Sequence, residues 1–418
     1  MTSTDLRVLR PEEWDTWYRT FELAFGGVPE SDEERALWRD VTDFGRTLAA
    51  WDGDQVAGTA LSHPFRLSVP GGALVAAAGV SAVGVAPTHR RRGILTAMMR
   101  RQLDDVRAAG EPLAVLCASE PEIYGRFGYG PAAYALFGEA DTARVSLAAS
   151  PGTDNGPDGD TGGVRLRLAD PEESLAECEA LYARRLTARP GMIRRLPHWE
   201  RLGVLDPAGE RDGASPLRCV LAESGGELRG YARYAVKPDW DLSGPKGAVV
   251  VRDVEALDPA AYAALWRYLF GIDLTSAVRF GPRPVDDPLR HLVSNLRRCG
   301  LRVRDTLHLR PVDVGAALAA RTYTTAVDVV LEVGDDFCPW NAGRWRLAGD
   351  TGGAVCERTG DPAELVLGVR ELGEVYLGGT SLAALAGAGR VRELRPGALE
   401  RADAAFSWPV APWLPHGF

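Results

Sequence analysis

The 418-residue sequence lacks long apolar runs, secretion signals and an excess of basic charge. Nowhere do 18 apolar residues follow one another, and the start, MTSTDLRVLRPEEW, has neither the basic nor the apolar segment of a signal peptide. We therefore expect a soluble cytoplasmic protein with no membrane partner. Basic residues number 48 against 57 acidic residues, and the net charge of −9 argues against a nucleic-acid partner.

Metal and disulfide motifs are missing as well. No C-x-x-C pair occurs, so we expect the cysteines to be reduced core residues: Cys117, Cys178, Cys219, Cys299, Cys338 and Cys356. The six histidines form no H-E-x-x-H motif and none has zinc-site spacing with a cysteine. The stretch DNGPDGD at 154–160 has no glutamate at its twelfth position, which favours an acidic linker over a calcium loop. We predict no metal site.

What is present is a basic turn between a strand and a helix, in VSAVGVAPTHRRRGILTAMMRR at 80–101. The valines predict a strand that ends before Pro87, and apolar residues from Ile94 onward recur at helical spacing. The helix would aim unpaired amides at the arginines at 90–92, an unfavourable meeting of like charges that an anion would relieve. A diphosphate fits best, because Gly93 allows close backbone approach. The simpler alternative is a solvated basic helix start.

P-loop and dinucleotide-binding spacings are absent, which disfavours nucleotide hydrolysis and hydride transfer. The basic turn instead resembles the acetyl-coenzyme A (acetyl-CoA) loop of the GCN5-related N-acetyltransferases, R/Q-x-x-G-x-G/A. Its three fixed positions are occupied by Arg90, Gly93 and Leu95, of which Leu95 departs from the small residue of the pattern. The surrounding order matches that fold: a hairpin at 46–69, the strand, the basic turn, a helix, a buried strand at 113–120 and PEIYGRFGYGPA.

Aromatic residues crowd the first helical segment, with Trp14, Trp17, Tyr18 and Phe21 on one side. A second helix begins with a capping pattern at Ser31 and Glu34. Such aromatics are more often core than ligand wall. Phe25 and Trp38 are the weaker candidates for lining an acceptor cleft.

Gly, Asp, Pro, Ser and Thr dominate residues 148–163, which predicts a linker. After it, 218–237 repeats the strand, turn and strand of the first hairpin, with Gly230 in the place of Gly58, and 248–270 repeats strand, turn and helix. The second turn is LDPAAY, without arginines, so we expect it to hold no diphosphate. Short strands and helices after 300, including DPAELVLGVRELGEVYLGG, resemble the sterol carrier protein fold, from which a lipid function does not follow.

The fold prediction is therefore mixed α/β (α+β): two tandem acetyltransferase folds followed by a sterol-carrier-protein-like domain. The predicted domains are 1–147, active and acetyl-CoA-binding; 164–298, degenerate; and 299–418, ending in the active site.

Acetyl transfer to an amine requires a neutral amine, a polarised thioester carbonyl and a proton donor for the departing thiolate. The strand at 80–85 can offer backbone groups, and Ser119 is placed to help. A phenol near pKa 10 stays protonated at neutral pH, so Tyr124 is the candidate donor, with a packed structural tyrosine as the alternative and Tyr129 as the rival. For the base, Glu120 and Glu122 are nearby. The apolar, proline-stiffened end AAFSWPVAPWLPHGF would bury the terminal carboxylate and raise its pKa, which would make it a better base. The simpler alternative is a packed structural tail.

Four stretches together resemble the enhanced intracellular survival (Eis) family of N-acetyltransferases: SAVGVAPTHRRRGIL, SEPEIYGRFGYGPA, LHLRPVDVGAALAARTY and APWLPHGF. The resemblance covers nearly the whole chain. It implies an active first domain, an inactive second and a sterol-carrier-like third. It also implies Tyr124 as general acid and the C-terminal carboxylate of Phe418 as general base. Implied coenzyme contacts are Val83, Gly84, Val85, Arg91, Arg92, Gly93, Ile94, Leu95, Thr96, Ser119 and Glu120.

The resemblance further implies a homohexamer that acetylates amines of aminoglycosides, often at several positions, and in some members lysines. The leading hypothesis is thus an acetyl-CoA-dependent N-acetyltransferase with a small-molecule amine acceptor. The alternatives are a protein lysine N-acetyltransferase and a non-enzymatic regulator that binds coenzyme A or a lipid.

Overall fold

The computed structural model describes residues 4–148 and 163–418, and the predicted linker lies largely outside them. The chain forms two compact units. The first unit combines Met1–Tyr134 with Thr187–Arg195 and Asp305–Phe418, and the second combines Ala135–Leu186 with Leu196–Arg304. The first unit thus combines most of the first and third predicted domains, while residues 135–147 and 299–304 belong to the second unit.

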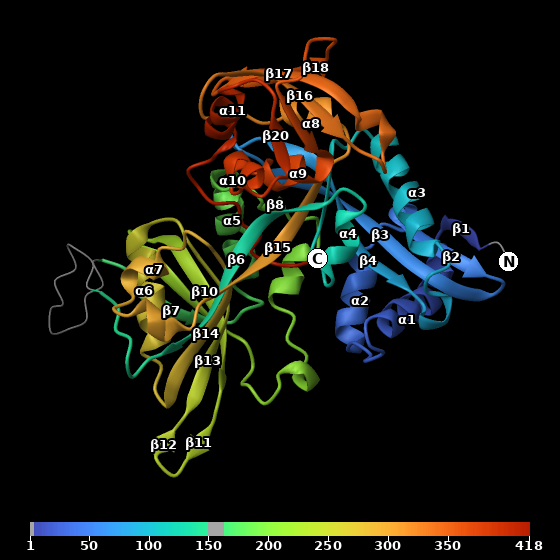
Figure 1. Ribbon diagram of the computed structural model, residues 1–418. Helices are drawn as coiled ribbons and strands as arrows, with labels where there is room; N and C mark the ends of the chain where they lie inside the picture. The colour runs from blue at the N-terminus through green and yellow to red at the C-terminus, as the bar shows by residue number, and fades with distance from the viewer. Residues whose placement is uncertain (1–3, 149–162) are drawn as a thin grey trace. The chain divides into compact units, whose positions relative to one another are not determined.

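The first unit contains a mixed sheet with the order β1-β2-β3-β4-β5-β15-β6 (Figure 1). All its described pairings are antiparallel except β4 with β5, which is parallel. The strands are β1 (Asp5–Val8), β2 (Thr47–Asp52), β3 (Gln55–Ser68), β4 (Leu74–Val85), β5 (Leu113–Leu116), β6 (Gly130–Asp141) and β15 (Arg302–Pro311). The predicted hairpin, central strand and buried parallel strand are all present.

Helices cover both faces of this sheet, because alternate strand residues point to opposite sides. Ala49 packs in one apolar cluster with the helix carrying Trp14 and Trp17, whereas Leu48 packs in another with Met98 of the helix that follows β4. The helices are α1 (Trp14–Ala24), α2 (Asp32–Val41), α3 (Ile94–Ala108) and α4 (Pro121–Gly125). The predicted cap of α2 is confirmed: Ser31 Oγ accepts from the Glu34 amide at 3.2 Å.

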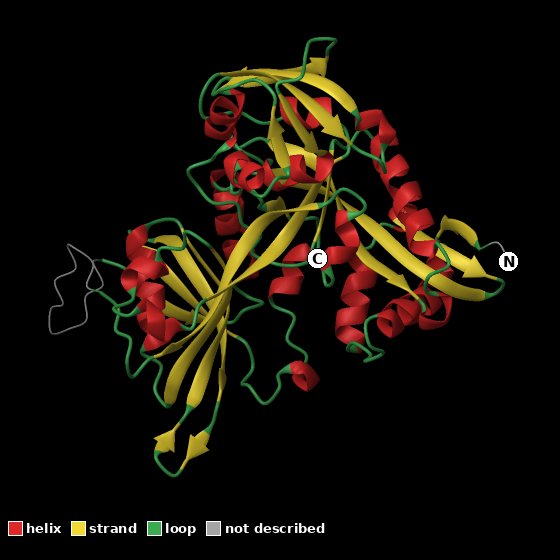
Figure 2. Cartoon of the chain, in the orientation of Figure 1, coloured by secondary structure: helices red, strands yellow, loops and turns green. Residues whose placement is uncertain are grey.

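A second sheet of the first unit has the order β18-β17-β16-β19-β20. Figure 2 draws strands in yellow and helices in red. Its strands are β16 (Val327–Gly334), β17 (Gly343–Asp350), β18 (Gly353–Arg358), β19 (Leu365–Gly368) and β20 (Val391–Glu393). Its helices are α8 (Val314–Ala319), α9 (Val369–Val375), α10 (Leu382–Gly387) and α11 (Ala398–Phe406). The short strands and helices predicted after residue 300 are therefore present.

The segment Thr187–Arg195 fastens the C-terminal tail to β3. Its strand β8 (Ile193–Arg194) pairs with β3, Leu67 opposite Ile193. The Trp413 amide donates to the Pro190 carbonyl at 2.9 Å, and an Arg189 guanidinium N–H donates to the Ala411 carbonyl at 2.5 Å. The tail is therefore packed rather than frayed.

The second unit is built around a sheet with the order β6-β14-β13-β10-β9-β7, in which β13 and β14 are parallel. Here β6 takes part from Ala135 onward. The other strands are β7 (Arg165–Ala169), β9 (Arg218–Ser224), β10 (Glu227–Lys237), β13 (Gly247–Ala256) and β14 (Thr275–Pro284), with a small hairpin of β11 (Trp240–Asp241) and β12 (Gly244–Pro245). The helices are α5 (Leu175–Arg185), α6 (Pro259–Phe270) and α7 (Leu289–Leu292). The predicted repeat of hairpin, strand, turn and helix is present.

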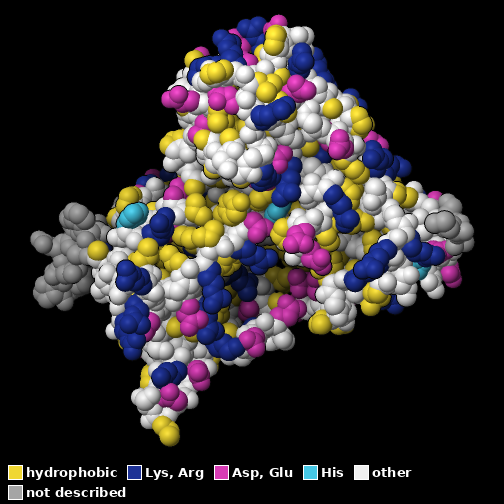
Figure 3. Space-filling view, in the orientation of Figure 1, with side chains coloured by type: hydrophobic (Ala, Val, Ile, Leu, Met, Phe, Trp, Pro, Cys, Tyr) yellow, Lys and Arg dark blue, Asp and Glu magenta, His cyan; other side chains and the backbone are white. Residues whose placement is uncertain are grey.

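Several expected features are compatible with the described part of the chain. Its helices include none long and apolar enough to cross a membrane. All six cysteines are free thiols. Within residues 4–148 and 163–418, no group of three or more His, Cys, Asp or Glu side chains is arranged to hold a metal ion. Basic and acidic side chains are interspersed on the face shown in Figure 3.

Candidate active site

The predicted anion loop connects β4 to α3. Gly93 is the N-cap of α3 with φ 84°, and it leaves the first helical amides without a side-chain cap. A Cβ atom on Gly93 would meet nothing within 4 Å, so this side of the backbone is open. Unpaired amides, the positive end of the helix dipole and exposed guanidinium groups therefore meet at one accessible point, which suits a diphosphate.

The loop is supported from behind by a chain of polar side chains. Asp52, at the end of β2, has Oδ2 at 3.2 Å from His89 Nε2 and at 3.4 Å from Arg92 Nη1. His89 Nδ1 lies 2.8 Å from Thr88 Oγ1. His89 is buried, whereas Arg92 is exposed. The support holds the turn while it leaves the arginines able to reach a ligand.

The strands β4 and β5 separate close to this loop. Their pairing runs only from Ala77 opposite Leu113 to Val80 opposite Leu116. Beyond Val80, β4 bulges against β3, and Thr59 Oγ1 donates to the Ala82 carbonyl at 2.8 Å. A bulge bends and twists its strand, so the backbone from Val83 onward turns away from β5.

A cavity of about 210 Å³ lies beside this separation. Its wall combines β4 and β5 with α1, α2, α4 and the chain end. The aromatic lining residues are Trp14, Trp17, Tyr18, Phe21, Phe25, Trp38, Tyr124 and Phe418; the others are Glu30, Glu34, Thr42, Leu61, His63, Val80, Ser81, Ala82, Val83, Leu116, Cys117 and Ser119. The aromatic residues of α1 are thus both core and cavity wall, and Phe25 and Trp38 do line the cavity.

Tyr124 enters this cavity from α4, whose first residue is Pro121. Burial, followed by the nearby Glu120 carboxylate, raises the pKa of Tyr124 to about 12. The side chain therefore stays a protonated donor at neutral pH. Tyr129 packs against it at 6.2 Å between ring centroids, is 1% exposed and is not among the lining residues. The geometry favours Tyr124 over its rival.

Phe418 reaches the same cavity from the opposite end of the chain. Its ring meets Phe65 edge to face at 5.0 Å, and it would lie 3.3 Å from a Cβ atom on Gly79. Arg195 Nε donates to His416 Nε2 at 3.3 Å just before the terminus. In Figure 1 the C-terminus is drawn beside α4. The terminal residue and the phenol thus share one cavity.

Sequence reasoning did not find three polar residues of the wall. Glu30 accepts a hydrogen bond from the Tyr18 hydroxyl, and Glu34 Oε1 accepts from Trp38 Nε1 at 3.3 Å. His63 is 1% exposed, and burial together with the Arg46 charge lowers its pKa to about 3, so it is neutral at pH 7. The sequence identified Glu34 only as part of the N-terminal cap of α2. No pattern among neighbouring residues indicated that these three side chains line a cavity.

The predicted site residues fall into two groups. Four of them line the cavity: Val83, Ser119, Tyr124 and Phe418. The rest lie outside the cavity lining, on three elements. Gly84 and Val85 end β4, Arg91, Arg92 and Gly93 form the loop with Ile94, Leu95 and Thr96 in the first turn of α3, and Glu120 is the N-cap of α4. Ile94 is buried and Leu95 half-buried, with Leu95 packed against the cluster of Leu48 and Ala57. Ser119 lies three residues beyond the end of β5 rather than on the strand.

Comparisons with known proteins agree with this architecture. Sequence profiles of acetyltransferase (GNAT) domains match residues 5–132 and 191–311, and a sterol carrier protein domain matches residues 314–415. The predicted order of two acetyltransferase folds and a sterol-carrier-like domain is thereby confirmed.

Relatives span the full chain. An uncharacterized N-acetyltransferase of Streptomyces avermitilis is 61% identical, with 100% of each chain covered. The N-acetyltransferase Eis of Mycobacterium tuberculosis is 35% identical over 95% of this chain and 96% of its own. The crystal structure of Eis1 from Mycobacterium abscessus matches with a TM-score of 0.83 at 37% identity, covering 99% of this chain and 100% of that one. The protein is an N-acetyltransferase and belongs to the Eis family of GCN5-related N-acetyltransferases.

Proposed function

We propose that this enzyme transfers the acetyl group of acetyl-CoA directly to a small-molecule amine, with Tyr124 as general acid and the Phe418 carboxylate as general base. The observation that carries the proposal is the meeting of Tyr124, Phe418 and the end of β4 around one cavity. These groups come from residues nearly 300 positions apart in sequence. They are the donor and the acceptor that aminolysis of a thioester requires.

The coenzyme fits the first acetyltransferase fold. The open N-terminus of α3 and the exposed arginines at 90–92 would hold the pyrophosphate. The backbone of Val83–Val85, beyond the pairing with β5, would bind the pantetheine arm. Ser119 and Glu120 lie after the end of β5, on the other side of the same separation. The thioester would then enter the cavity between these two segments.

The proposed steps balance in protons. The Phe418 carboxylate takes a proton from the ammonium group, and the freed lone pair attacks the thioester carbonyl carbon. The C–S bond breaks, and the Tyr124 phenol protonates the departing thiolate. The nitrogen loses its second proton, which restores the phenol through solvent, so one proton is released for each amide formed.

The acceptor class follows from the cavity wall. Carboxylates of Glu30 and Glu34 among aromatic rings favour a cation, through ion pairing and through cation–π contact. Together with the family resemblance, this supports aminoglycoside amines as acceptors, at one or several positions. A lysine side chain carries the same ammonium on an apolar stem, so protein lysines are the second candidate. The resemblance also supports a homohexamer acting in the cytoplasm.

A regulator without turnover is not supported, because the family is one of enzymes. The core of the sterol-carrier-like domain is also filled by its own side chains. Arg321, Tyr323 and Tyr376 are buried there, and Arg321 donates to the carbonyls of Tyr376 and Phe406.

The test is mass spectrometry of an amine panel incubated with acetyl-CoA and enzyme. Aminoglycosides, simple polyamines and lysine peptides form the arms. Acetylated aminoglycosides would support the proposal, and their mass would give the number of acetyl groups added. Acetylation of the peptides alone would instead indicate a protein lysine N-acetyltransferase. No product in any arm would contradict both.

Replacing Tyr124 with Phe should lower kcat on the order of 10²-fold, the usual contribution of general acid catalysis. The matched control is Tyr262→Phe, which removes another buried phenol that donates to Asp287 in the second unit, and it should leave kcat unchanged. Because the pKa of Tyr124 is about 12, kcat of the unchanged enzyme should show no alkaline fall between pH 8 and 10. Full activity of Tyr124→Phe would remove this residue from the mechanism.

A further inference from the structure

The turn that follows Tyr124 is packed against the sterol-carrier-like domain. Two glycines of this turn have no room for a side chain. A Cβ atom on Gly128 would lie 1.8 Å from Arg310 Nη1 and 2.8 Å from Val369, and one on Gly130 would lie 2.4 Å from the Arg370 carbonyl. A Cβ atom on Gly125 would meet only the guanidinium end of Arg370, at 2.9 Å. The glycines therefore serve close contact between domains as well as reversal of the chain.

Arg310, on β15, reaches the middle of the turn. Its side chain is fully buried, and one guanidinium N–H donates to the Phe127 carbonyl. The Phe127 amide in turn donates to the Tyr124 carbonyl at 3.0 Å, and the Tyr129 amide donates to the same carbonyl at 3.2 Å. One hydrogen bond from Arg310 thus acts on the backbone that carries the Tyr124 side chain.

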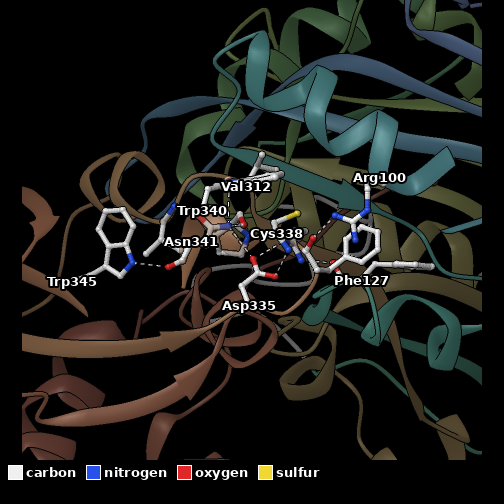
Figure 4. Close-up of polar contacts among 12 residues, drawn as sticks. Arg100, Phe127, Val312, Asp335, Cys338, Trp340, Asn341 and Trp345 are labelled. Carbon is white, nitrogen blue, oxygen red and sulfur yellow. Dashed lines mark hydrogen bonds and ion pairs between the residues drawn. The ribbon is translucent and has the colours of Figure 1, made fainter. Parts of the chain in front are cut away.

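Asp335 holds Arg310 in place. Its Oδ2 accepts from Arg310 Nη2 at 2.5 Å and from Asn341 Nδ2 at 3.0 Å, while its Oδ1 accepts from the Cys338 amide at 2.9 Å. Figure 4 shows Asp335 at the centre of a chain of polar contacts that extends through Asn341 to Trp345. Asp335 is 5% exposed and Asn341 1%, so water does not weaken these bonds.

The loop at 335–341 also contacts the helix of the coenzyme loop. Arg100 of α3 donates to the Phe337 carbonyl at 2.9 Å and lies 4.3 Å from the centre of the Phe337 ring. The same ring meets Phe127 edge to face, at 5.0 Å between centroids. One loop therefore touches both the helix that would hold the coenzyme and the turn that carries the proposed acid.

A buried ion pair is a weak source of stability, since apolar residues of similar volume often do as well. It does impose a defined geometry when every partner is satisfied. Catalysis needs such a geometry, because an error of about 1 Å in a reacting group can cost on the order of 10²-fold in rate.

We infer that Arg310 and Asp335 are positioning residues for Tyr124, through which the sterol-carrier-like domain orients the acid of the first acetyltransferase fold. The inference rests on the proposed role of Tyr124. It assigns this domain a function in the reaction that is separate from carrying a lipid and from supplying the chain end.

The primary variant is Asp335→Asn. Asparagine keeps the shape but has a single acceptor oxygen, so at least one of the three donors would face an NH₂ group. The matched control is Asp287→Asn in the second unit. Asp287 is also buried and also accepts three hydrogen bonds, in its case from an arginine, a tyrosine hydroxyl and a backbone amide: Arg283, Tyr262 and Leu289. Both variants remove the same kind of network.

With the best aminoglycoside substrate, Asp335→Asn should lower kcat about tenfold and leave the KM for acetyl-CoA within about twofold, since the acid and not the coenzyme loop is displaced. Asp287→Asn should lower the melting temperature of the protein about as much as Asp335→Asn does, but it should leave kcat unchanged. In a Tyr124→Phe background, Asp335→Asn should cause no further loss of kcat, because its effect passes through the missing phenol.

Arg310→Lys is the second variant, for use if Asp335→Asn does not fold. Lysine keeps the charge next to Asp335 but cannot reach both Asp335 and the Phe127 carbonyl. We therefore expect Arg310→Lys to lower kcat in the otherwise unchanged enzyme, and to cause no further loss of kcat in the Tyr124→Phe background. Additive losses with Tyr124→Phe, or a lower melting temperature with unchanged kcat, would overturn the inference. Full activity of Tyr124→Phe alone would instead overturn the proposed function, so the two failures are distinguishable.

Discussion

The two acetyltransferase folds of this chain differ at the helix that follows the central strand. In the first fold, α3 begins at Gly93 with no side-chain cap. In the second, α6 begins at Asp258, whose Oδ1 accepts from the Ala261 amide at 2.9 Å while Oδ2 binds Arg229 at 2.9 Å. The amides that could receive a diphosphate in α3 are met in α6 by a carboxylate of the chain itself.

The space beside the central strand differs as well. Counting three residues from Gly58 and from Gly230 leads to Leu61 in one fold and Arg233 in the other. Leu61 pairs in register with Ser81, and both line the cavity. Arg233 pairs in register with Asp253, its side chain is fully buried, and Nη1 lies 3.2 Å from the Asp253 carboxylate. The second fold therefore has an ion pair, Arg233 with Asp253, at the positions where the first fold has the cavity-lining residues Leu61 and Ser81.

Both folds nevertheless keep the bulge between the hairpin and the central strand, at Thr59/Leu61 in one and at Arg233/Tyr234 in the other. The shared backbone therefore does not make a site. A few side chains decide whether the helix end and the adjacent space remain open, which is a general property of functional sites on common folds.

The largest expected effect concerns the ion pair of the second fold. Arg233→Leu should lower the free energy of unfolding by about 3 kcal/mol, the low end for such pairs, because it leaves the half-buried Asp253 charge without its partner. The double variant Arg233→Leu/Asp253→Ser, which restores the residue types of Leu61 and Ser81, should recover most of this loss. Chemical denaturation of the full chain measures both. A double variant as unstable as the single one would show that the two folds are not interchangeable here.

A change at the chain end tests whether the first fold uses the Phe418 carboxylate as its base, a group for which the second fold has no described counterpart. One glycine added after Phe418 moves the carboxylate by about 3 to 4 Å, and should lower kcat on the order of 10²-fold if it is the base. Phe418→Leu retains the carboxylate and loses only the ring contact with Phe65, so its effect on kcat should be smaller. Undiminished turnover by the extended chain would exclude the terminal base.

Giving α3 a carboxylate like that of α6 should weaken coenzyme binding. Gly93→Asp should raise the KM for acetyl-CoA about tenfold through repulsion of the diphosphate, an effect near the upper end of helix-terminus electrostatics. Gly93→Asn is the control, because asparagine has the same shape and also tolerates a positive φ. Steady-state kinetics at varied acetyl-CoA concentration measures both KM values. Equal values for the two variants would contradict repulsion between the carboxylate and the diphosphate as the cause.

The smallest effect is expected from the reverse change. Asp258→Ala should destabilise the protein by about 1 kcal/mol, the usual value of an N-cap, and leave the KM for acetyl-CoA unchanged. Thermal unfolding and kinetics of the same preparation measure the two quantities. A shift in KM would mean that the second fold also takes part in coenzyme binding.

Local patterns predicted most of the elements near the site. The valines before Pro87 and the helical spacing after Gly93 lie within short windows, and β4 and α3 follow them. Glu30, His63 and Arg310 were missed as site residues, because their importance depends on what they face. Arg310 and Asp335 are 25 positions apart on different elements, and no spacing rule links them.

The sequence by itself determined which fold units form and where an anion could bind, since strand alternation, helix period and capping are properties of neighbouring residues. Only the tertiary structure decided that Phe418 shares a cavity with Tyr124, that Asp335 reaches the turn after Tyr124 through Arg310, and that an ion pair occupies the second fold. These outcomes depend on packing between segments far apart in the chain, where a side chain's role is set by its spatial neighbours.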